Sequence, residues 1–519
     1  GFFVAGKHDQ YKLNIPYHAL AAAFRDLVRQ LLTESAAGVA RWKARLNEAL
    51  QENGQLMVDL VPELELVMGP QPPVTTLPTH DGQQRFNTVV VRFLRVVAGA
   101  ERPLVLFLDD LQWIDSASLA LIRSLAAAGD GLHLLLVGAY RDNEVDPTHP
   151  LMTTIDALQG DGAQISRIVL SPLGEGSIRE IVADTLRCDG AAAAGLAQLL
   201  RDKTGGNPFF LMRFLETLSD EGYLRYDPAA RAWTWDADEI ASMESTENVV
   251  DFVVSQLQRH PAVTQDVLKM AACIGGTFDL ATLAAVTELP VPEVAAALWE
   301  AVQHGELILQ SPATRDEART GQARTSLAAM SLAPDGVRFR FFHDRVQQAA
   351  FALVDRARLG AIHLRIGRLL WKTWAGDDLS EHVFDIVSHL GQCVSLLDPG
   401  DERRRFAALC LDAGRRAKGS AAYQAALGYL ETGLSLIGED GWKTDYELCV
   451  ALHFDRAECA YANGDSDEAE AVFGRILANA HTPLEKARVY QLRANLAVHA
   501  VQYAAALEHT MEGLRLLGT

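Results

Sequence analysis

The chain has 519 residues, a mass of 56.6 kDa and a formal net charge of −20. With 49% hydrophobic residues it can bury several cores, which excludes a protein that is disordered throughout. The acidic balance disfavours a general binder of nucleic-acid backbones, because such binding needs clustered cations. No apolar run approaches the roughly 18 residues of a membrane span, and the opening Gly1-Phe2-Phe3 lacks the basic segment of a signal peptide.

The cysteines and the first residue bear on where the protein works and on its completeness. Six cysteines are scattered without a CxxC pair, so neither a zinc ribbon nor a disulfide framework is predicted. This usage is typical of reduced thiols in a cytoplasmic protein, and we expect no membrane association. The sequence does not begin with methionine, so we expect an internal piece of a longer protein.

The first 170 residues alternate short apolar runs with segments of helical spacing. Runs that are apolar at every position fit strands buried on both faces, and helices between them favour a parallel α/β sheet. The expected strands are 2–5, 104–108 and 132–137, and the expected helices are 19–32 and 86–97.

From residue 171 the predicted secondary structure changes from alternating strands and helices to a mainly helical pattern. A helical pattern from residue 171 is broken at Gly205-Gly206-Asn207-Pro208 and ends in two β-like pieces, 222–226 and 233–235. Several short helices follow, and then an expected strand pair, 307–309 and 337–342. Helices closed by a β-hairpin suggest a winged-helix module.

After residue 350 nearly every segment has helical spacing, and three segments resemble one another. Aligning Ala425, Ala469 and Ala505 gives spacings of 44 and 36 residues. Tetratricopeptide repeats have a period of about 34 residues. We therefore favour divergent tetratricopeptide-like helical hairpins, and an irregular helical array is the alternative.

The strongest chemical signal is the apolar run at 104–108, which ends in Asp109 and Asp110. A rigid strand that ends in two carboxylates is what a Walker B element needs. The first acid would hold Mg²⁺, and the second would orient or deprotonate the attacking water. The alternative is a buried strand that runs into an ordinary acidic turn.

The continuation of this run, LDDLQWID at 108–115, closely resembles the STAND class of P-loop ATPases, which are signal-transduction ATPases with many domains. Two further stretches near the N-terminus fit that resemblance. GKHDQ at 6–10, with IPY at 15–17, is similar to a GKFDQ…IPY variant found in bacterial hybrid histidine kinases and serine/threonine kinase fusions. GAYRDNE at 138–144 is similar to the segment whose arginine, here Arg141, senses the γ-phosphate.

Two motifs later in the chain extend the resemblance to residue 350 or so. Gly206-Asn207-Pro208 resembles the lid motif whose proline packs on adenine. FFHDR at 341–345 resembles the winged-helix motif whose histidine, here His343, reads the β-phosphate of ADP. The resemblance implies ATP or ADP and Mg²⁺ as ligands, with Asp110 and Arg141 catalytic and Asp109 binding the metal.

Each of these residues also has a structural interpretation. Arg141 could pair only with Asp142 or Glu144. The stretch 205–208 could simply end one helix and begin the next, since glycine fits a C-cap and proline a first turn. Such a role is compatible with contact to adenine. His343 could be a packed core histidine on a strand.

A phosphate-binding loop reading G-x-x-x-x-G-K-[ST] is expected in such an ATPase. Gly1 to His8 matches its first part by count, but residues 2–5 are bulky and strand-like, and His8 replaces the hydroxyl that binds Mg²⁺. Residues 9–16 look extended and do not begin a helix. We therefore expect the true loop upstream of residue 1.

The expected organisation is an ATPase core without its P-loop (1–170), a helical lid (171–240), a winged-helix domain (241–350) and a tetratricopeptide-like region (351–519). The expected function is a nucleotide-dependent switch in a larger bacterial signalling kinase. Its partners would be covalently attached kinase or effector domains and proteins bound by the helical repeats. One alternative is a scaffold with a degenerate nucleotide site. Another is a DNA-binding regulator, but the lack of a dense basic helix in 245–350 disfavours DNA binding. The parent protein is expected to be an ATPase or protein kinase, and this stretch, which lacks the Walker A loop, is expected to be inactive alone.

Overall fold

The computed structural model describes residues 1–10, 12, 15–74, 79–129, 131–242, 249–310, 336–374, 379–499 and 501–518. They form two compact units. One unit consists of residues 1–165 together with 360–519, and the other of residues 166–359.

The first unit contains a three-stranded parallel sheet in the order β1-β2-β3. Its strands are β1 (Phe2–Lys7), β2 (Leu104–Asp109) and β3 (Leu134–Gly138). β2 is the middle strand, and alternate leucines along it, 104, 106 and 108, are completely buried. The strands expected at 104–108 and 132–137, and their parallel arrangement, are confirmed.

Helices of the N-terminal part supply most of the apolar side chains that pack with this sheet. The sequence gives them clear start signals: Ser35 caps α2 by accepting from the Gly38 amide at 3.2 Å, and Asp115 caps α6 by accepting from the Ser118 amide at 2.9 Å. The bounds are α1 (His18–Leu32), α2 (Ala36–Leu50), α3 (Gly54–Leu60), α4 (Glu65–Met68), α5 (Thr79–Val97), α6 (Ser116–Ala126) and α7 (Pro150–Gly160).

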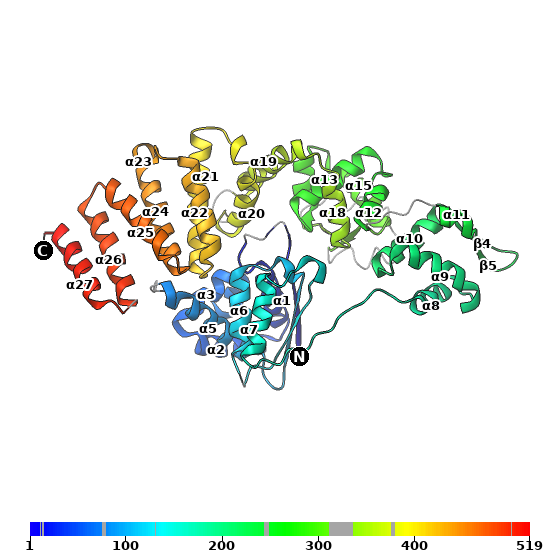
Figure 1. The fold of residues 1–519 in the computed structure, drawn as a ribbon, viewed down its shortest axis with the longest axis horizontal. Helices are drawn as coiled ribbons and strands as arrows, with labels where there is room; N and C mark the ends of the chain where they lie inside the picture. Colours follow the sequence, from blue (N-terminus) through cyan, green and yellow to red (C-terminus); the bar gives the residue numbers. More distant parts are fainter. Residues whose placement is uncertain are drawn as a thin grey trace. The chain divides into compact units, whose positions relative to one another are not determined.

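The rest of the first unit is helical, as the sequence predicted. Consecutive helices pair as hairpins, α21 with α22, α24 with α25 and α26 with α27 (Figure 1). The bounds are α19 (Arg356–Thr373), α20 (Leu379–Gly391), α21 (Asp401–Gly419), α22 (Tyr423–Ile437), α23 (Gly441–Thr444), α24 (Tyr446–Ala462), α25 (Ser466–Asn479), α26 (Pro483–His499) and α27 (Tyr503–Leu516).

The three hairpins share one turn geometry. Each turn contains a residue in the left-handed region, at positions 421, 464 and 501. In each, the next amide donates to the carbonyl of an alanine five residues earlier, at 2.8, 2.9 and 2.7 Å. This is the Schellman arrangement, which satisfies carbonyls at the end of the first helix. The repeat is therefore a repeat of backbone geometry.

The turn geometry corrects the alignment of the repeats by one residue. Five positions after each left-handed residue lies a buried alanine: Ala426, Ala469 and Ala506. The equivalent spacings are thus 43 and 37 residues, and the residues at 425 and 505 are only partly buried. Sequence alone could not set this register, because alanines stand side by side at 425–426 and 504–506.

The helical tail and the parallel sheet share one hydrophobic core. Leu104 and Phe24 of the sheet region belong to the same buried cluster as Phe406, Tyr429 and Leu452 of α21, α22 and α24. An ion pair of 3.0 Å between Lys12 and Asp385 joins the segment after β1 to α20. The tail therefore completes the core around the sheet.

The second unit begins with a helical part. Its core is formed by apolar residues of α8, α9 and α10, closed by a two-stranded antiparallel hairpin. The hairpin strands lie where the sequence predicted β-like pieces. The bounds are α8 (Glu175–Leu186), α9 (Gly190–Thr204), α10 (Pro208–Asp220), β4 (Leu224–Asp227), β5 (Ala232–Trp235) and α11 (Ala237–Ser242).

The second part of this unit packs helices on a three-stranded antiparallel sheet in the order β6-β8-β7. The expected pairing of 307–309 with 337–342 is confirmed, with Leu307 opposite Phe341. The sequence analysis missed the third strand, β6. The bounds are α12 (Val249–Leu257), α13 (Ala262–Ile274), β6 (Thr277–Asp279), α14 (Leu280–Thr287), α15 (Val291–Gln303), β7 (Leu307–Leu309), β8 (Arg338–Phe341) and α18 (Asp344–Ala352).

Within the described ranges no single helix is long and apolar enough to cross a membrane. Only α14 and α15 together reach that length and composition, and they are bent by 114° at the break between them.

Close packing in the helical tail predicts a difference between two glycines of α22. A Cβ at Gly433 would lie 2.8 Å from Cδ2 of Leu452 and 3.2 Å from Cβ of Cys410, whereas a Cβ at Gly428 would meet no atom within 4 Å. We expect Gly433→Val to lower the free energy of unfolding by about 1–3 kcal/mol through overpacking. Gly428→Val, at an exposed position of the same helix, should cause no comparable loss.

Thermal unfolding followed by circular dichroism at 222 nm measures both variants. A melting temperature equal in the two variants would show that α22 does not pack tightly against α21 and α24.

Candidate functional site

Charged side chains gather at the carboxyl edge of the parallel sheet. Parallel strands present their carboxyl ends at one edge, and the register places Lys7 of β1 opposite Asp109 of β2. Asp110 follows directly, and Arg141 lies three residues beyond the end of β3. The structure thus brings Asp109, Asp110 and Arg141, three of the five predicted site residues, to one place.

Asp110 is the centre of this arrangement. Its side chain is only 6% exposed, and its backbone lies in the left-handed region at φ 54° and ψ 47°. Aspartate tolerates this region better than most residues, since its short polar side chain can bond locally. The turn directs the chain out of β2 into a short 3₁₀ helix, η3 (Leu111–Trp113), and leaves the Asp110 carboxylate beside three partners.

Lys7, Gln112 and Arg141 are those partners. Lys7 Nζ lies 3.2 Å from Asp110 Oδ2 and 3.7 Å from Asp109 Oδ2. The side-chain amide of Gln112 donates to Asp110 Oδ1 at 2.9 Å, and an Arg141 guanidinium nitrogen lies 3.5 Å from the same oxygen. The Asp110 carboxylate is therefore held in one orientation from both sides.

Arg141 is itself positioned by several contacts. Its backbone amide donates to Gln112 Oε1 at 3.3 Å, and its guanidinium pairs with Glu144 at 2.9 Å and lies over the ring of Trp113 at 5.2 Å. The pairing with Glu144 that the structural interpretation proposed is present. It coexists with the contact to Asp110, so the arginine lies at the sheet edge and not at a remote turn.

Sequence reasoning missed Lys7 and Gln112 as parts of this site. Gln112 appears in the sequence analysis only as part of the LDDLQWID stretch, although it bridges Asp110 and the Arg141 backbone. Lys7 was named only within the GKHDQ resemblance. The sequence does show a lysine at the end of the first strand and two aspartates at the end of the second. This pattern indicates a shared site only once β1 is known to pair with β2.

His8 is buried next to the same carboxylate, with 4% of its surface exposed. Burial lowers the pKa of its imidazole to about 4, against the opposing attraction of Asp110. Its Nε2 has no hydrogen-bond partner among the residues that the structure describes. A buried polar atom without a partner is uncommon in proteins and is often found at functional sites.

The first residues do not form a phosphate-binding loop. Residues 2–7 are a strand paired with β2, and a Cβ at Gly6 would lie 2.2 Å from the carbonyl oxygen of Ala19. Glycine at position 6 is therefore explained by the close approach of α1. The expectation that 9–16 is extended was wrong at its described positions: the Lys12 amide donates to the Asp9 carbonyl and the Ile15 amide to the Lys12 carbonyl, which makes turns.

The remaining two predicted site residues lie in the second unit. Gly205 ends α9 in the left-handed conformation, Asn207 caps α10 by accepting from the Phe210 amide at 3.0 Å, and Pro208 is the first residue of α10. The structural role of 205–208 that the sequence suggested is present. Gly206 also fits closely, because a Cβ there would lie 2.5 Å from the Leu173 carbonyl oxygen.

His343 lies beyond the strand on which it was expected. β8 ends at Phe341, and His343 is the N-cap of α18, where its Nδ1 accepts from the Arg345 amide at 3.1 Å. Its ring stacks on Phe209, the residue after Pro208, with centroids 4.2 Å apart. Within the second unit His343 therefore contacts the residue that directly follows the predicted lid motif.

The residues at the sheet edge fit the ligands that an ATPase requires. Two adjacent carboxylates supply the hard oxygen ligands that Mg²⁺ prefers. Lys7 and Arg141 supply cationic donors of the kind that bind phosphate, and His8 brings a buried nitrogen that has no hydrogen-bond partner among the described residues. Pro208 and His343 belong to the other unit, so the structure does not add them to this edge.

The buried neutral state of His8 makes part of the stability of the first unit sensitive to acid. Its pKa is about 4 when folded and about 6.5 when unfolded, so the unfolded chain binds the extra proton between these values. The contribution is complete above pH 6.5 and is lost as the pH falls to 4, at a slope of at most about 1.4 kcal/mol per pH unit. We expect His8→Gln to be less acid-sensitive than the wild type by up to this amount.

Urea denaturation at pH 7, 5.5 and 4.5, with the wild type and His8→Gln side by side, measures the difference. Titration of the His8 Cε1 proton by NMR in the folded protein gives an independent value. An inflection near pH 6.5, together with parallel pH profiles of the two proteins, would contradict the prediction.

Comparisons with known proteins give a family match for the N-terminal residues and a relative that matches nearly the whole chain. Residues 1–137 match the family model described as AAA ATPase domain. The chain is 26% identical over 618 aligned residues to "Hybrid signal transduction histidine kinase G" of Dictyostelium discoideum, a match that covers 99% of this chain and 18% of that protein. The chain therefore spans less than a fifth of the length of this relative.

Among solved structures, a signal transduction ATPase with numerous domains (STAND) and a tetratricopeptide repeat sensor, from Pyrococcus horikoshii, matches 99% of this chain and 74% of that chain. The TM-score is 0.34 and the sequence identity 11%. The recognition from sequence is confirmed: residues 1–137 match the AAA ATPase domain model, and the chain is similar along nearly its whole length to part of a hybrid signalling kinase.

Proposed function

We propose that this chain is the nucleotide-dependent switch of a larger cytoplasmic signalling kinase, and that the carboxyl edge of its parallel sheet hydrolyses ATP slowly. The observation that carries the proposal is the cluster of Lys7, Asp109, Asp110 and Arg141 in residues that belong, for the most part, to an AAA ATPase domain. The six cysteines are all free thiols, which supports a reducing compartment.

Asp109 is the proposed metal ligand. Its side chain is 40% exposed at the end of β2, so it can reach a cation from solvent, and one of its oxygens already accepts from the Asp110 amide at 3.0 Å. Mg²⁺ would neutralise the charge of the nucleotide phosphates there. Lys7 lies near both carboxylates, so Lys7 and the ion together would neutralise the negative charge of the two aspartates.

Asp110 is the proposed general base. It is nearly buried, and contacts to Lys7, Gln112 and Arg141 hold its carboxylate in place. A fixed carboxylate can accept the proton of the attacking water without first reorganising its surroundings. Arg141, which lies 3.5 Å from the same carboxylate, is proposed to stabilise negative charge on the phosphoryl group.

The second unit is proposed to respond to the nucleotide. We assign α8–α11 with β4 and β5 as the lid, and α12–α15 and α18 with β6–β8 as the winged helix. Two observations within the unit support a role for His343. Its Nδ1 accepts a backbone hydrogen bond, so a neutral ring carries its proton on Nε2, which makes Nε2 a donor suited to a phosphate oxygen. Its stacking on Phe209 couples it to Pro208, the proposed adenine contact.

The helical hairpins are the proposed relay to protein partners, and attached kinase or effector domains are the proposed outputs. The relative's name, a hybrid histidine kinase, supports the second point. The alternative function is a scaffold that binds proteins through the same hairpins without using nucleotide. Hydrolysis measurements separate the two.

Substituting the proposed base tests the enzymatic part. In the protein as its gene encodes it, we expect Asp110→Asn to lower the rate of ATP hydrolysis by about 100-fold or more, the usual contribution of a general base. Nucleotide affinity should change little, because Asp109 keeps its carboxylate. Phosphate release measures the rate, and fluorescent ATP the affinity.

Asp156→Asn is the matched control, since Asp156 is an exposed aspartate of α7 in the same unit. Hydrolysis at the same rate in Asp110→Asn and in the control would refute the assignment and favour the scaffold.

The proposed phosphate contact of His343 can be tested separately from its structural role as the N-cap of α18. His343→Asn keeps a good N-cap for α18 but removes the Nε2 donor, so we expect an unchanged melting temperature without nucleotide. With saturating ADP, the variant should lose a large part of the ADP-induced rise, since a hydrogen bond to a charged group is worth about 1.5–3 kcal/mol.

His343→Ala serves as the second variant, because loss of the cap should lower the melting temperature with and without ADP. If His343→Asn keeps the full ADP-induced rise, His343 only caps the helix.

A further inference from the structure

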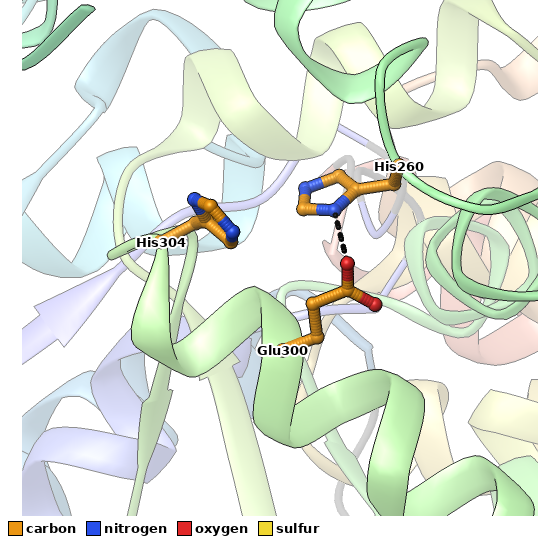
Figure 2. Close-up of side chains that lie close together, drawn as sticks. All are labelled: His260, Glu300 and His304. Atoms are coloured by element: carbon orange, nitrogen blue, oxygen red, sulfur yellow. Dashed lines mark hydrogen bonds and ion pairs between the residues drawn. The ribbon is translucent and has the colours of Figure 1, made fainter. Parts of the chain in front are cut away.

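A cluster of metal-ligating side chains in the second unit includes none of the residues assigned above. His260 comes from the segment between α12 and α13, and Glu300 and His304 come from the last turn and the C-cap of α15. Figure 2 shows the three side chains converging. One ligand atom of each lies within 4.8 Å of the other two.

Both ring nitrogens of His260 face carboxylates. Nε2 lies 2.9 Å from each oxygen of Glu306, and Nδ1 lies 3.3 Å from Oε1 of Glu300. The Glu306 side chain is only 3% exposed, so it is an enclosed acceptor that requires a proton donor. The Nε2–H of His260 supplies it, which leaves Nδ1 to face Glu300.

Glu306 therefore has the position of an outer partner of a metal-binding histidine. Metal-ligating histidines usually donate their second ring N–H to a carboxylate or carbonyl, which fixes the tautomer and the ring orientation. Here this contact leaves the other nitrogen of His260 facing Glu300.

The second ligand residue is oriented in the same manner. The hydroxyl of Thr264 donates to Glu300 Oε2 at 2.8 Å, which leaves Oε1 toward His260. The backbone carbonyl of His304 accepts from Arg213 at 2.7 Å, so the backbone that carries its exposed ring is fixed. Arg213 is paired in turn with Glu216 at 2.8 Å.

The two carboxylates around His260 favour a bound cation. An unprotonated Nδ1 that faces a carboxylate at 3.3 Å brings two lone pairs together, and Glu300 and Glu306 together carry two negative charges. Either a second proton on His260 or a metal ion must lie between these atoms. A second proton on His260 would satisfy the contact with Glu300. It would not explain why the His304 ring lies 5.1 Å from the His260 ring.

We propose that His260, Glu300 and His304 bind one Zn²⁺ ion, with Glu306 and Thr264 as outer partners. Two imidazoles and a carboxylate form a donor set that suits zinc, whereas Mg²⁺ and Ca²⁺ prefer oxygen ligands. In a tetrahedral site with bonds of about 2.0–2.1 Å, adjacent ligand atoms are about 3.3 Å apart. The Nδ1–Oε1 separation already has this value, and the exposed His304 ring can close the remaining distance by rotating its side chain.

The ion would join two segments that are about 40 residues apart in sequence. It would tie the end of α12 to the end of α15, directly before β7, in the part of the unit that contains the antiparallel sheet. Three protein ligands leave the fourth position for water.

The test uses the full chain, stripped with a chelator and titrated with ZnCl₂ by calorimetry, and then with CoCl₂ by visible absorption. We expect one tight equivalent of Zn²⁺ and the intense d–d bands of tetrahedral Co²⁺. His304→Ala and Glu300→Gln should each weaken binding at least about 10-fold, which is the lower range for loss of even an outer partner.

Two variants serve as matched controls. Glu293→Gln changes an exposed glutamate in the first turn of the same helix, and His133→Ala an exposed histidine of the other unit. Both should bind zinc as the wild type does, and far-UV circular dichroism checks that every variant is folded. If the chain takes up no zinc, or if His304→Ala and Glu300→Gln bind it as tightly as the controls, the proposal is wrong and His260 is a protonated bridge between two glutamates.

Discussion

Parallel pairing of β1 with β2 is the constraint on which the candidate site depends. With Lys7 opposite Asp109, the cation at the end of one strand must lie against the acids at the end of the next. The left-handed turn at Asp110 then places its carboxylate between Lys7 and Arg141. A shift of the strand by one residue would point these side chains to opposite faces, because side chains alternate along a strand.

The same sheet depends on segments far away in sequence. Helices of the C-terminal region contribute Phe406, Tyr429 and Leu452 to the core that buries Leu104 and Phe24. A partner that bends or shifts these helical hairpins would therefore act on the core that holds β2 in place. This packing gives a physical route from the helical region to the sheet edge, along which the proposed switch would act.

The two units contain their charged clusters for different physical reasons. At the sheet edge, cations and carboxylates meet where strands end, and Asp109 remains accessible to a ligand from solvent. In the second unit, His260 is enclosed by carboxylates on both of its nitrogens, and only His304 of that cluster is exposed. The first arrangement suits reversible binding of a large anion with its metal, and the second suits a cation held for stability.

The sequence by itself determined the features that local patterns encode. The apolar run before Asp109 predicted β2, Gly205 and Pro208 marked the end of α9 and the start of α10, and the recurring alanines predicted hairpins, since apolar runs, helix termini and helix spacing are encoded over a few residues. Tertiary structure alone decided that Lys7 meets Asp110, that His260 meets Glu300, and that Ala426 is the buried alanine of its repeat. Such contacts join residues from 40 to over 100 positions apart, or choose between adjacent equivalent residues, so they follow from how elements pack and not from the pattern of any one segment.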